Sequence, residues 1–209
     1  LVQFPLAARR LGAHVLHTQY NLSPLARGGI TTINDLSFFR GPEWFMPRDR
    51  ALLQRFVPAS ARRARAVVTV SESSREDFHR FIPGIENKIS VIPNALPIGF
   101  QPVSREVGLR RVSTELGIRK PYLLTVGTRW PRKNMQLATE AFRLLGSEDL
   151  DLVVTGKPGW GELDMPPGVT ATGYVPDDLM PSLYAGAELY LAPSRCEGFG
   201  IPLLEAWAS

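Results

Sequence analysis

Short apolar runs that alternate with amphipathic segments constrain the fold of this chain more than any other feature. In the first half, strands are expected at residues 14–19, 30–34, 66–70 and 89–92, and helices at 48–65 and 73–82. The first helix should be bent or broken at Pro58, and Ser71 or Ser73 suits the N-cap of the second. Strands separated by helices pair in parallel through right-handed crossovers. The pattern therefore predicts a doubly wound α/β unit.

The second half repeats this pattern with clearer signals. Strands are expected in YLLTVGT, DLVVTG, VTATGYV and ELYLAP, which are residues 122–128, 151–156, 169–175 and 188–193. One helical face is formed by Leu137, Ala138, Ala141, Leu144 and Leu145. A further helix over residues 176–187 should begin at Asp177 or Asp178 as its cap. A second α/β unit is therefore predicted.

The segment between the halves, residues 93–121, is punctuated by proline and only weakly periodic. Such composition is typical of a linker, here with room for one short helix. We therefore expect a partial N-terminal domain over residues 1–95, an interdomain linker over 96–120 and a partial C-terminal domain over 121–209.

Composition excludes several classes of protein. The 209 residues include one cysteine, which rules out an internal disulfide framework and a cysteine-based zinc site, and the three histidines are scattered. The sequence therefore offers no convincing set of metal ligands. No apolar run approaches the roughly 20 residues of a membrane span. The expected location is the cytoplasm, with peripheral contact at the inner face of the membrane left open.

The net charge of +4 and the arginine clusters at Arg9–Arg10, Arg62–Arg63 and Arg110–Arg111 favour an anionic partner. A phosphate ligand and an anionic membrane surface both fit, and so does the plainer interpretation of solvated helix faces. No nucleic-acid partner is expected, because the sequence has no helix-turn-helix, aromatic RNA-binding signature or zinc knuckle.

Three loops follow strands of the second half, and ligands of doubly wound folds bind at the carboxyl ends of strands. The loops are GTRWPRKN, GKPGWG and PSRCEGFGIP, at residues 127–134, 156–161 and 193–202, and all three should open onto one rim. The first offers Arg129, Arg132 and Lys133 just before a helix, a combination suited to a phosphate group. The glycines of the second permit close approach of the backbone but equally suit a plain turn.

The third loop carries the most information. Gly198 and Gly200 leave backbone N–H groups free to face a phosphate, and Pro202 suits the first helical position. Glu197 lies on the turn, and Glu205, eight positions later, lies on the helix just past its first turn. A carboxylate can accept from two vicinal hydroxyls, as sugar recognition requires. The alternative is that Glu205 only favours the early helix through its charge.

At these residues the sequence resembles a known family. EGFGIPLLE resembles the E-x7-E element of retaining glycosyltransferases with the GT-B fold, specifically the large family four. TINDLSFFRGPEWF, VVTVSESSREDF, VIPNAL and LLTVGTRWPRKN resemble other motifs of that family in the same order. The resemblance implies two Rossmann-like domains that face a cleft, both incomplete here. It also implies an internal fragment of a longer enzyme.

The resemblance further implies a reaction and its residues. A hexose would pass from a nucleotide-diphosphate sugar to a hydroxyl of a carbohydrate or lipid-linked acceptor, with the anomeric configuration kept. Glu197, Arg132 and Lys133 would be catalytic, since fixed cations stabilise charge on the leaving diphosphate. The donor-binding residues would be Glu205, Gly198, Phe199, Gly200, Gly127, Thr128 and Asn34. The resemblance implies that neither a metal nor another cofactor is needed for this chemistry.

Two alternatives to this reaction stay open, and the one without an enzymatic role rests on a departure from the family pattern. Asn34 stands where the family usually has histidine, and asparagine cannot titrate near neutral pH. A GT-B relative that epimerises a nucleotide-sugar is the alternative enzyme. A sugar-nucleotide-binding protein with weakened catalysis is the alternative without an enzymatic role.

Overall fold

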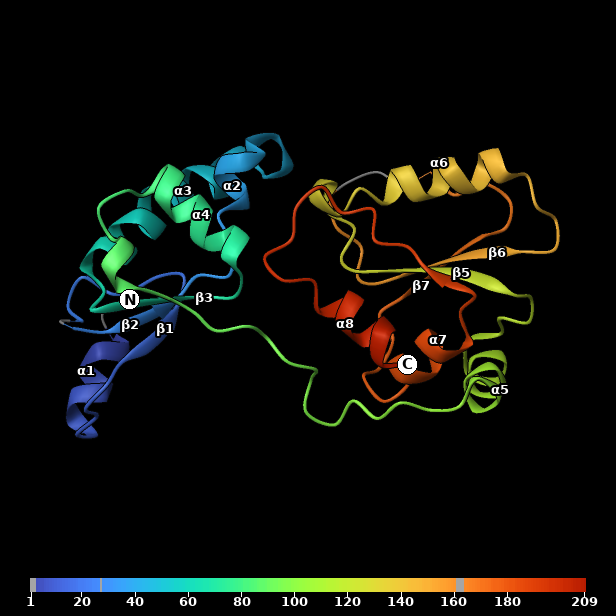
Figure 1. Cartoon of the computed structure of the whole chain (residues 1–209), viewed down its shortest axis with the longest axis horizontal. Coiled ribbons are helices and arrows are strands. Elements are labelled where there is room, and N and C mark those ends of the chain that lie inside the picture. The colour runs from blue at the N-terminus through green and yellow to red at the C-terminus, as the bar shows by residue number, and fades with distance from the viewer. Residues whose placement is uncertain (1–2, 27, 161–163) are drawn as a thin grey trace. The chain divides into compact units, whose positions relative to one another are not determined.

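The computed structural model describes residues 3–26, 28–160 and 164–209 of the chain (Figure 1). It divides into two compact units. The first comprises Leu1–Asn94 with Glu197–Phe199, and the second comprises Ala95–Cys196 with Gly200–Ser209. In the described part of the chain, no helix is long and apolar enough to cross a membrane.

The first unit contains a parallel sheet with the strand order β1-β2-β3-β4. The strands are β1 (His17–Gln19), β2 (Ile30–Thr32), β3 (Ala66–Thr69) and β4 (Ile89–Val91). The helices are α1 (Gln3–Arg10), α2 (Ser37–Arg40), α3 (Pro47–Arg63) and α4 (Glu72–Phe81), with 3-10 turns η1 (Pro42–Trp44) and η2 (Glu86–Lys88). The predicted parallel α/β arrangement is confirmed, although each strand is shorter than expected.

Helix α3 runs through Pro58 as one helix, so of the bend or break expected there the break does not occur. A proline inside a helix removes one hydrogen bond and costs about 3 kcal/mol. Val57 and Ala61, on either side of Pro58, are fully buried in the core with Ile33, Val67 and Phe78. This burial holds the helix together across the proline.

Helix α4 begins as the sequence predicts. The Ser71 hydroxyl accepts a hydrogen bond from the Ser74 amide at 3.1 Å, which identifies Ser71 as the N-cap. A serine cap satisfies one of the backbone N–H groups that have no partner inside a helix.

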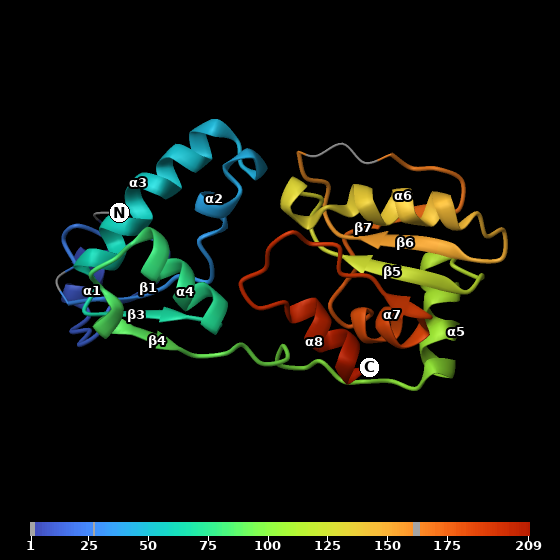
Figure 2. The same ribbon diagram turned by 45° about the horizontal axis from the view of Figure 1, so that its top comes forward.

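The second unit contains a parallel sheet with the order β7-β6-β5-β8. The strands are β5 (Tyr122–Val126), β6 (Asp151–Thr155), β7 (Val169–Gly173) and β8 (Leu189–Tyr190). The helices are α5 (Arg105–Leu116), α6 (Met135–Leu145), α7 (Met180–Gly186) and α8 (Ile201–Ala208), and a 3-10 turn η3 (Pro131–Lys133) precedes α6. Figures 1 and 2 show α6 on one face of this sheet and α5 with α7 on the other.

Alternate residues of the central strands explain these two layers. Leu124 and Val153 belong to the core on the side of α5 and α7, whereas Leu152 and Val154 pack with Phe142 of α6. Both faces of the sheet are therefore buried, as expected for the continuous apolar runs of parallel strands.

The segment expected to be the linker, residues 96–120, contains α5. This helix packs closely on α7, because a Cβ added to Gly108 would lie 2.8 Å from the Ser182 carbonyl oxygen. Val112 of α5 is fully buried in the same core. Helix α5 is therefore part of the second unit.

Helix α7 has no aspartate cap, so the expectation for Asp177 or Asp178 is wrong. Its N-cap residue is Leu179, which makes no side-chain capping bond. The preceding residues form a tight turn in which the Leu179 amide donates to Pro176 at 3.0 Å. Leu179 is buried, and the Asp178 carboxylate instead accepts from Arg111 at 3.2 Å. Burial of the leucine side chain thus sets where the helix starts.

Candidate functional site

The strand order places a candidate site at the carboxyl ends of β5 and β8. Beyond β5 the chain continues to β6 on one side, and it later returns to form β8 on the other side. Such a reversal of strand order opens a crevice at the carboxyl ends of the two strands, where ligands of doubly wound folds bind. The loops after β5 and β8 therefore border this position.

Backbone hydrogen bonds join the three loops, which confirms that they share one rim. The Arg129 amide donates to the Lys157 carbonyl at 3.2 Å, joining the first loop (127–134) to the second (156–160). The Arg195 amide donates to the Arg132 carbonyl at 2.9 Å, joining the third loop (193–200) to the first. Gly161, which ends the predicted second loop, lies outside the described residues.

The second loop packs against the first. A Cβ at Gly156 would overlap with the Gly127 carbonyl oxygen, and the φ angle of Gly156 is +137°. Only glycine fits such a position without strain. The plain interpretation, a turn that must approach another backbone closely, accounts for Gly156.

The first loop places a cation over the end of β5. Gly127 has a φ angle of +145°, and a Cβ there would lie 3.1 Å from Cε and 3.5 Å from Nζ of Lys133. The Gly127 amide donates to the Thr155 carbonyl of β6 at 2.8 Å, and the Thr128 carbonyl accepts from Trp130 at 2.7 Å. A glycine followed by a tight turn thus lets the lysine side chain lie against the backbone.

Arg132 and Asn134 hold the third loop in place. The Arg132 guanidinium donates through Nη1 to the Cys196 carbonyl, and the Asn134 side chain donates to the Pro193 carbonyl at 3.1 Å. Arg132 and Lys133 lie in η3, directly before α6, as the sequence predicts. The loop GTRWPRKN contains three basic residues and no acidic one, a composition suited to phosphate oxygens.

Helix α8 begins after Gly200, which has a φ angle of +95°. Ile201 is the first helical residue, so Pro202 occupies the second position instead of the first as predicted. This shift removes no hydrogen bond, because the first four N–H groups of a helix have no partner within it.

Glu205 is the fifth residue of α8, past the first turn as predicted. Its Oε2 accepts a hydrogen bond from the Tyr184 hydroxyl of α7 at 2.7 Å. Burial raises the pKa of Glu205, while the bond from Tyr184 acts in the opposite direction and lowers it. Burial, followed by the bond to Glu205, also raises the pKa of Tyr184.

These contacts weaken the interpretation that Glu205 serves only the helix dipole, because that effect fades beyond the first turn. Glu205 also lines a hollow of about 270 Å³ in the second unit. The other residues around the hollow are Pro97, Ile98, Gly99, Phe100, Asp177, Asp178 and Met180. A partly buried acceptor beside an open hollow is suited to hydroxyl groups of a ligand.

The predicted site residues fall in both units. Gly127, Thr128, Arg132, Lys133, Gly200 and Glu205 belong to the second unit, whereas Asn34, Glu197, Gly198 and Phe199 belong to the first. Asn34 lies two residues after the end of β2, and its backbone carbonyl accepts from the Ser74 hydroxyl at 2.8 Å. This bond fixes the main chain at Asn34 to the start of α4.

Sequence reasoning missed Tyr184 and Asn134. Tyr184 lies 21 positions before its partner Glu205, and no periodic pattern connects the two residues. Asn134 belongs to the first predicted loop, but its role in holding the third loop could not be predicted, because its bond to Pro193 spans 59 positions. Within the described residues, no group of three or more histidine, cysteine, aspartate or glutamate side chains could hold a metal ion.

Comparison with known families gives two matches that follow each other along the chain. The model of Glycosyltransferase Family 4 matches residues 1–100, and that of Glycosyl transferases group 1 matches residues 120–209. Among curated proteins, the chain is 32% identical over 190 residues to the O-antigen chain mannosyltransferase B of Escherichia coli, covering 85% of this chain and 50% of that protein. It is 26% identical over 200 residues to the O-antigen chain mannosyltransferase RfbU of Salmonella typhimurium, and this match covers 92% of this chain and 53% of that protein. The chain thus spans about half the length of the curated relatives it matches.

Solved structures show the same fold. Anabaena HepE, solved in complex with UDP and glucose, superposes with a TM-score of 0.70 at 20% identity over 88% of this chain and 51% of that one. Sucrose-phosphate synthase from Thermosynechococcus elongatus superposes with a TM-score of 0.73 at 18% identity, over 97% of this chain and 56% of that one. These likenesses confirm the predicted GT-B class of α/β fold.

Proposed function

The chain belongs to the glycosyltransferases of group 1 and family 4, and on this premise we propose a reaction for the full-length protein. It transfers a hexose from a nucleoside-diphosphate sugar to a hydroxyl of a carbohydrate or lipid-linked acceptor and retains the anomeric configuration. The names of the curated relatives favour mannose as the hexose and a polysaccharide chain as the product.

The arrangement of Lys133 over Gly127 carries this proposal. A nucleoside diphosphate accumulates negative charge as it leaves the sugar, and cations already in place stabilise that charge without further reorganisation. Lys133 and Arg132 lie in one short turn at the carboxyl end of β5, and the backbone of Gly127 leaves room for the lysine. Both side chains therefore suit a diphosphate group bound at this rim.

In this proposal, two carboxylates bind the two sugar groups of the donor. Glu205, held by Tyr184, accepts hydroxyl groups of the ribose. Glu197, on the loop before α8, contacts the hexose. The solved complexes of HepE with UDP-glucose and with UDP concern a protein of the same fold, and they support a nucleotide-sugar as the class of donor.

Asn34 favours a second candidate function. Asparagine can exchange hydrogen bonds with a sugar but cannot accept or release a proton near neutral pH. A protein that binds the nucleotide-sugar and transfers it poorly would have the same rim and the same Tyr184–Glu205 pair.

Donor turnover by the full-length protein tests these functions. The protein is incubated with GDP-mannose or UDP-glucose and with mannose-terminated oligosaccharides, and products are identified by NMR. A product whose new anomeric bond is axial, as in the donor, supports the proposal. An equatorial bond in the product would show inversion and would contradict it. If calorimetry shows that the donor binds but neither transfer nor hydrolysis occurs, the result would instead support a nucleotide-sugar-binding protein with weakened catalysis.

A further inference from the structure

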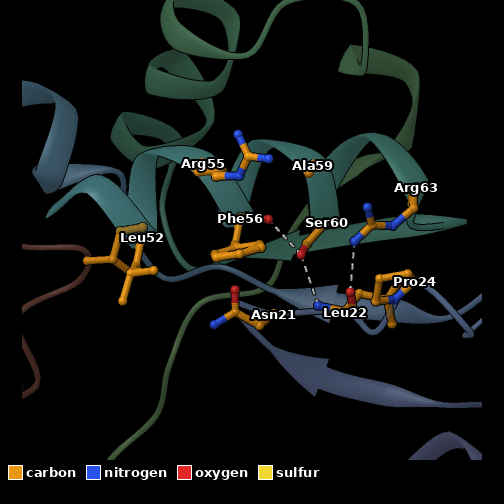
Figure 3. A pocket seen from close by; sticks show the side chains of 10 residues that line it. Asn21, Leu22, Pro24, Leu52, Arg55, Phe56, Ala59, Ser60 and Arg63 are labelled. Atoms are coloured by element: carbon orange, nitrogen blue, oxygen red, sulfur yellow. Dashed lines mark hydrogen bonds between the residues drawn. The ribbon is translucent and has the colours of Figure 1, made fainter. Parts of the chain in front are cut away.

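A groove in the first unit lies between α3 and the loop after β1, and none of the proposed catalytic and donor-binding residues lines it. It encloses about 590 Å³ and is lined by Asn21, Leu22, Pro24, Leu52, Leu53, Arg55, Phe56, Ala59, Ser60 and Arg63 (Figure 3). This volume falls in the range of roughly 300–1,000 Å³ that is typical of small-molecule sites. The groove is therefore large enough for a ligand.

One stripe of α3 forms a wall of the groove. Leu52, Phe56 and Ala59 recur at helical spacing, so they lie on the same side of the helix. Leu52 remains 46% exposed and Phe56 41% exposed, although both are large and apolar. Figure 3 shows the Phe56 ring on the side of α3 that faces Asn21 and Leu22.

The floor of the groove is apolar because its backbone is already satisfied. The Leu22 amide donates to the Ser60 hydroxyl at 3.0 Å, and the Leu22 carbonyl accepts from Arg63 at 2.9 Å. Leu22 itself is 1% exposed. A hydrocarbon chain laid along this floor would meet side-chain carbon without burying an unsatisfied backbone group.

The wall helix also carries an excess of positive charge. Helix α3 contains five arginines and one aspartate, an excess that equals the net charge of +4 of the whole chain. Among the described residues, none of these arginines takes part in an ion pair. Arg63 is engaged with Leu22, so Arg55 is the groove arginine placed to meet an anionic group at the rim.

We propose that this groove binds a lipid phosphate, with the hydrocarbon chain along Leu52 and Phe56 and the phosphate at Arg55. The apolar walls would bind the hydrocarbon chain of the lipid, and the Arg55 guanidinium, which forms no ion pair among the described residues, would bind the anionic head group. The inference goes beyond the proposed transfer reaction, and it rests only on contacts within the first unit.

Arg62 provides a matched control. It is an exposed arginine on the same helix but does not line the groove. Arg55→Glu and Arg62→Glu change the charge of α3 equally, so a site in the groove and a general attraction of the helix to an anionic surface predict different results. Leu52→Gln tests the apolar wall, with Leu144→Gln on α6 as its exposed control.

The test measures binding to the full-length protein of dodecyl phosphate below its micelle concentration, with inorganic phosphate and dodecyltrimethylammonium as probes that lack one half of the ligand. We expect Arg55→Glu and Leu52→Gln each to weaken dodecyl phosphate at least tenfold. The two control variants should bind like the parent, and the two partial probes should bind at least tenfold more weakly. Thermal melts confirm that each variant is folded.

A second arm uses vesicles of phosphatidylglycerol and of phosphatidylcholine. Equal losses in Arg55→Glu and Arg62→Glu, with dodecyl phosphate or with phosphatidylglycerol vesicles, would overturn the groove in favour of a charged surface. Absence of dodecyl phosphate binding by the parent would overturn it as well. Because all measurements are of binding, these outcomes are independent of whether the protein transfers a sugar.

Discussion

The side chain of Lys133 lies over Gly127, with Cε 3.1 Å from the point where a side chain on that glycine would begin. Gly127 directly follows β5 and has a φ angle of +145°, and Lys133 lies in the turn η3 before α6. Two positions six residues apart therefore meet at the carboxyl end of the sheet. This arrangement can be tested through the glycine as well as through the lysine.

Gly127→Ala should weaken binding of a nucleoside diphosphate because the new methyl group displaces Lys133. It should also destabilise the fold by about 1–3 kcal/mol, since alanine is strained at this φ angle. Gly146→Ala is the control, with a φ angle of +62° and open space around its Cβ. Calorimetry and thermal melts should show strain in both variants but lost affinity only in Gly127→Ala.

Lys133→Ala in the full-length protein should weaken diphosphate binding and reduce turnover, with a loss of about 3–4 kcal/mol in transition-state stabilisation. Arg132→Ala should have a similar effect and should additionally loosen the third loop, because Arg132 donates to the Cys196 carbonyl. Arg143→Ala, on the exposed side of α6, is the control. Unchanged kcat/KM in both loop variants would show that the phosphate is bound elsewhere.

The two glutamates should fail in different ways. Glu205→Gln should weaken every donor that shares the nucleotide by about 1.5–3 kcal/mol, the value of hydrogen bonds to a charged group. Glu197→Gln should leave bare nucleoside diphosphate binding intact and depress transfer, because its proposed contact is to the reacting sugar. Calorimetry with the diphosphate and turnover with the donor separate these effects. Equal losses of diphosphate affinity would contradict the division of roles.

Tyr184→Phe should shift the pH dependence of nucleotide binding. Burial raises the pKa of Glu205 and the Tyr184 bond lowers it, so removing the hydroxyl should raise that pKa further. If the carboxylate binds ribose, affinity is lost as the pH falls through this pKa, and the loss should begin at a higher pH in Tyr184→Phe. Calorimetry from acid to neutral pH measures the shift. Identical profiles would show that Tyr184 does not influence the carboxylate.

The same raised pKa affects stability. The folded state holds the Glu205 proton more tightly than the unfolded state does. The stability that this proton contributes is therefore complete below the ordinary carboxyl pKa, and it is lost as the pH rises through the raised pKa of the folded state. Relative to the parent, Glu205→Gln should therefore gain stability as the pH rises from acid to neutral. Glu148→Gln, at an exposed position, is the control.

The sequence by itself determined the order of the strands along the chain, an N-cap at Ser71 or Ser73 and the common rim of three loops, whereas helices α1 and α2 were not predicted. These features depend on neighbouring residues, because side-chain periodicity, caps and turns act over a few positions, and parallel topology then fixes which strand ends meet. The pairing of Glu205 with Tyr184, the continuity of α3 through Pro58 and the start of α7 at a buried leucine were decided only by the tertiary structure. Each depends on burial against residues distant in the chain, and packing can outweigh a local preference worth only a few kcal/mol.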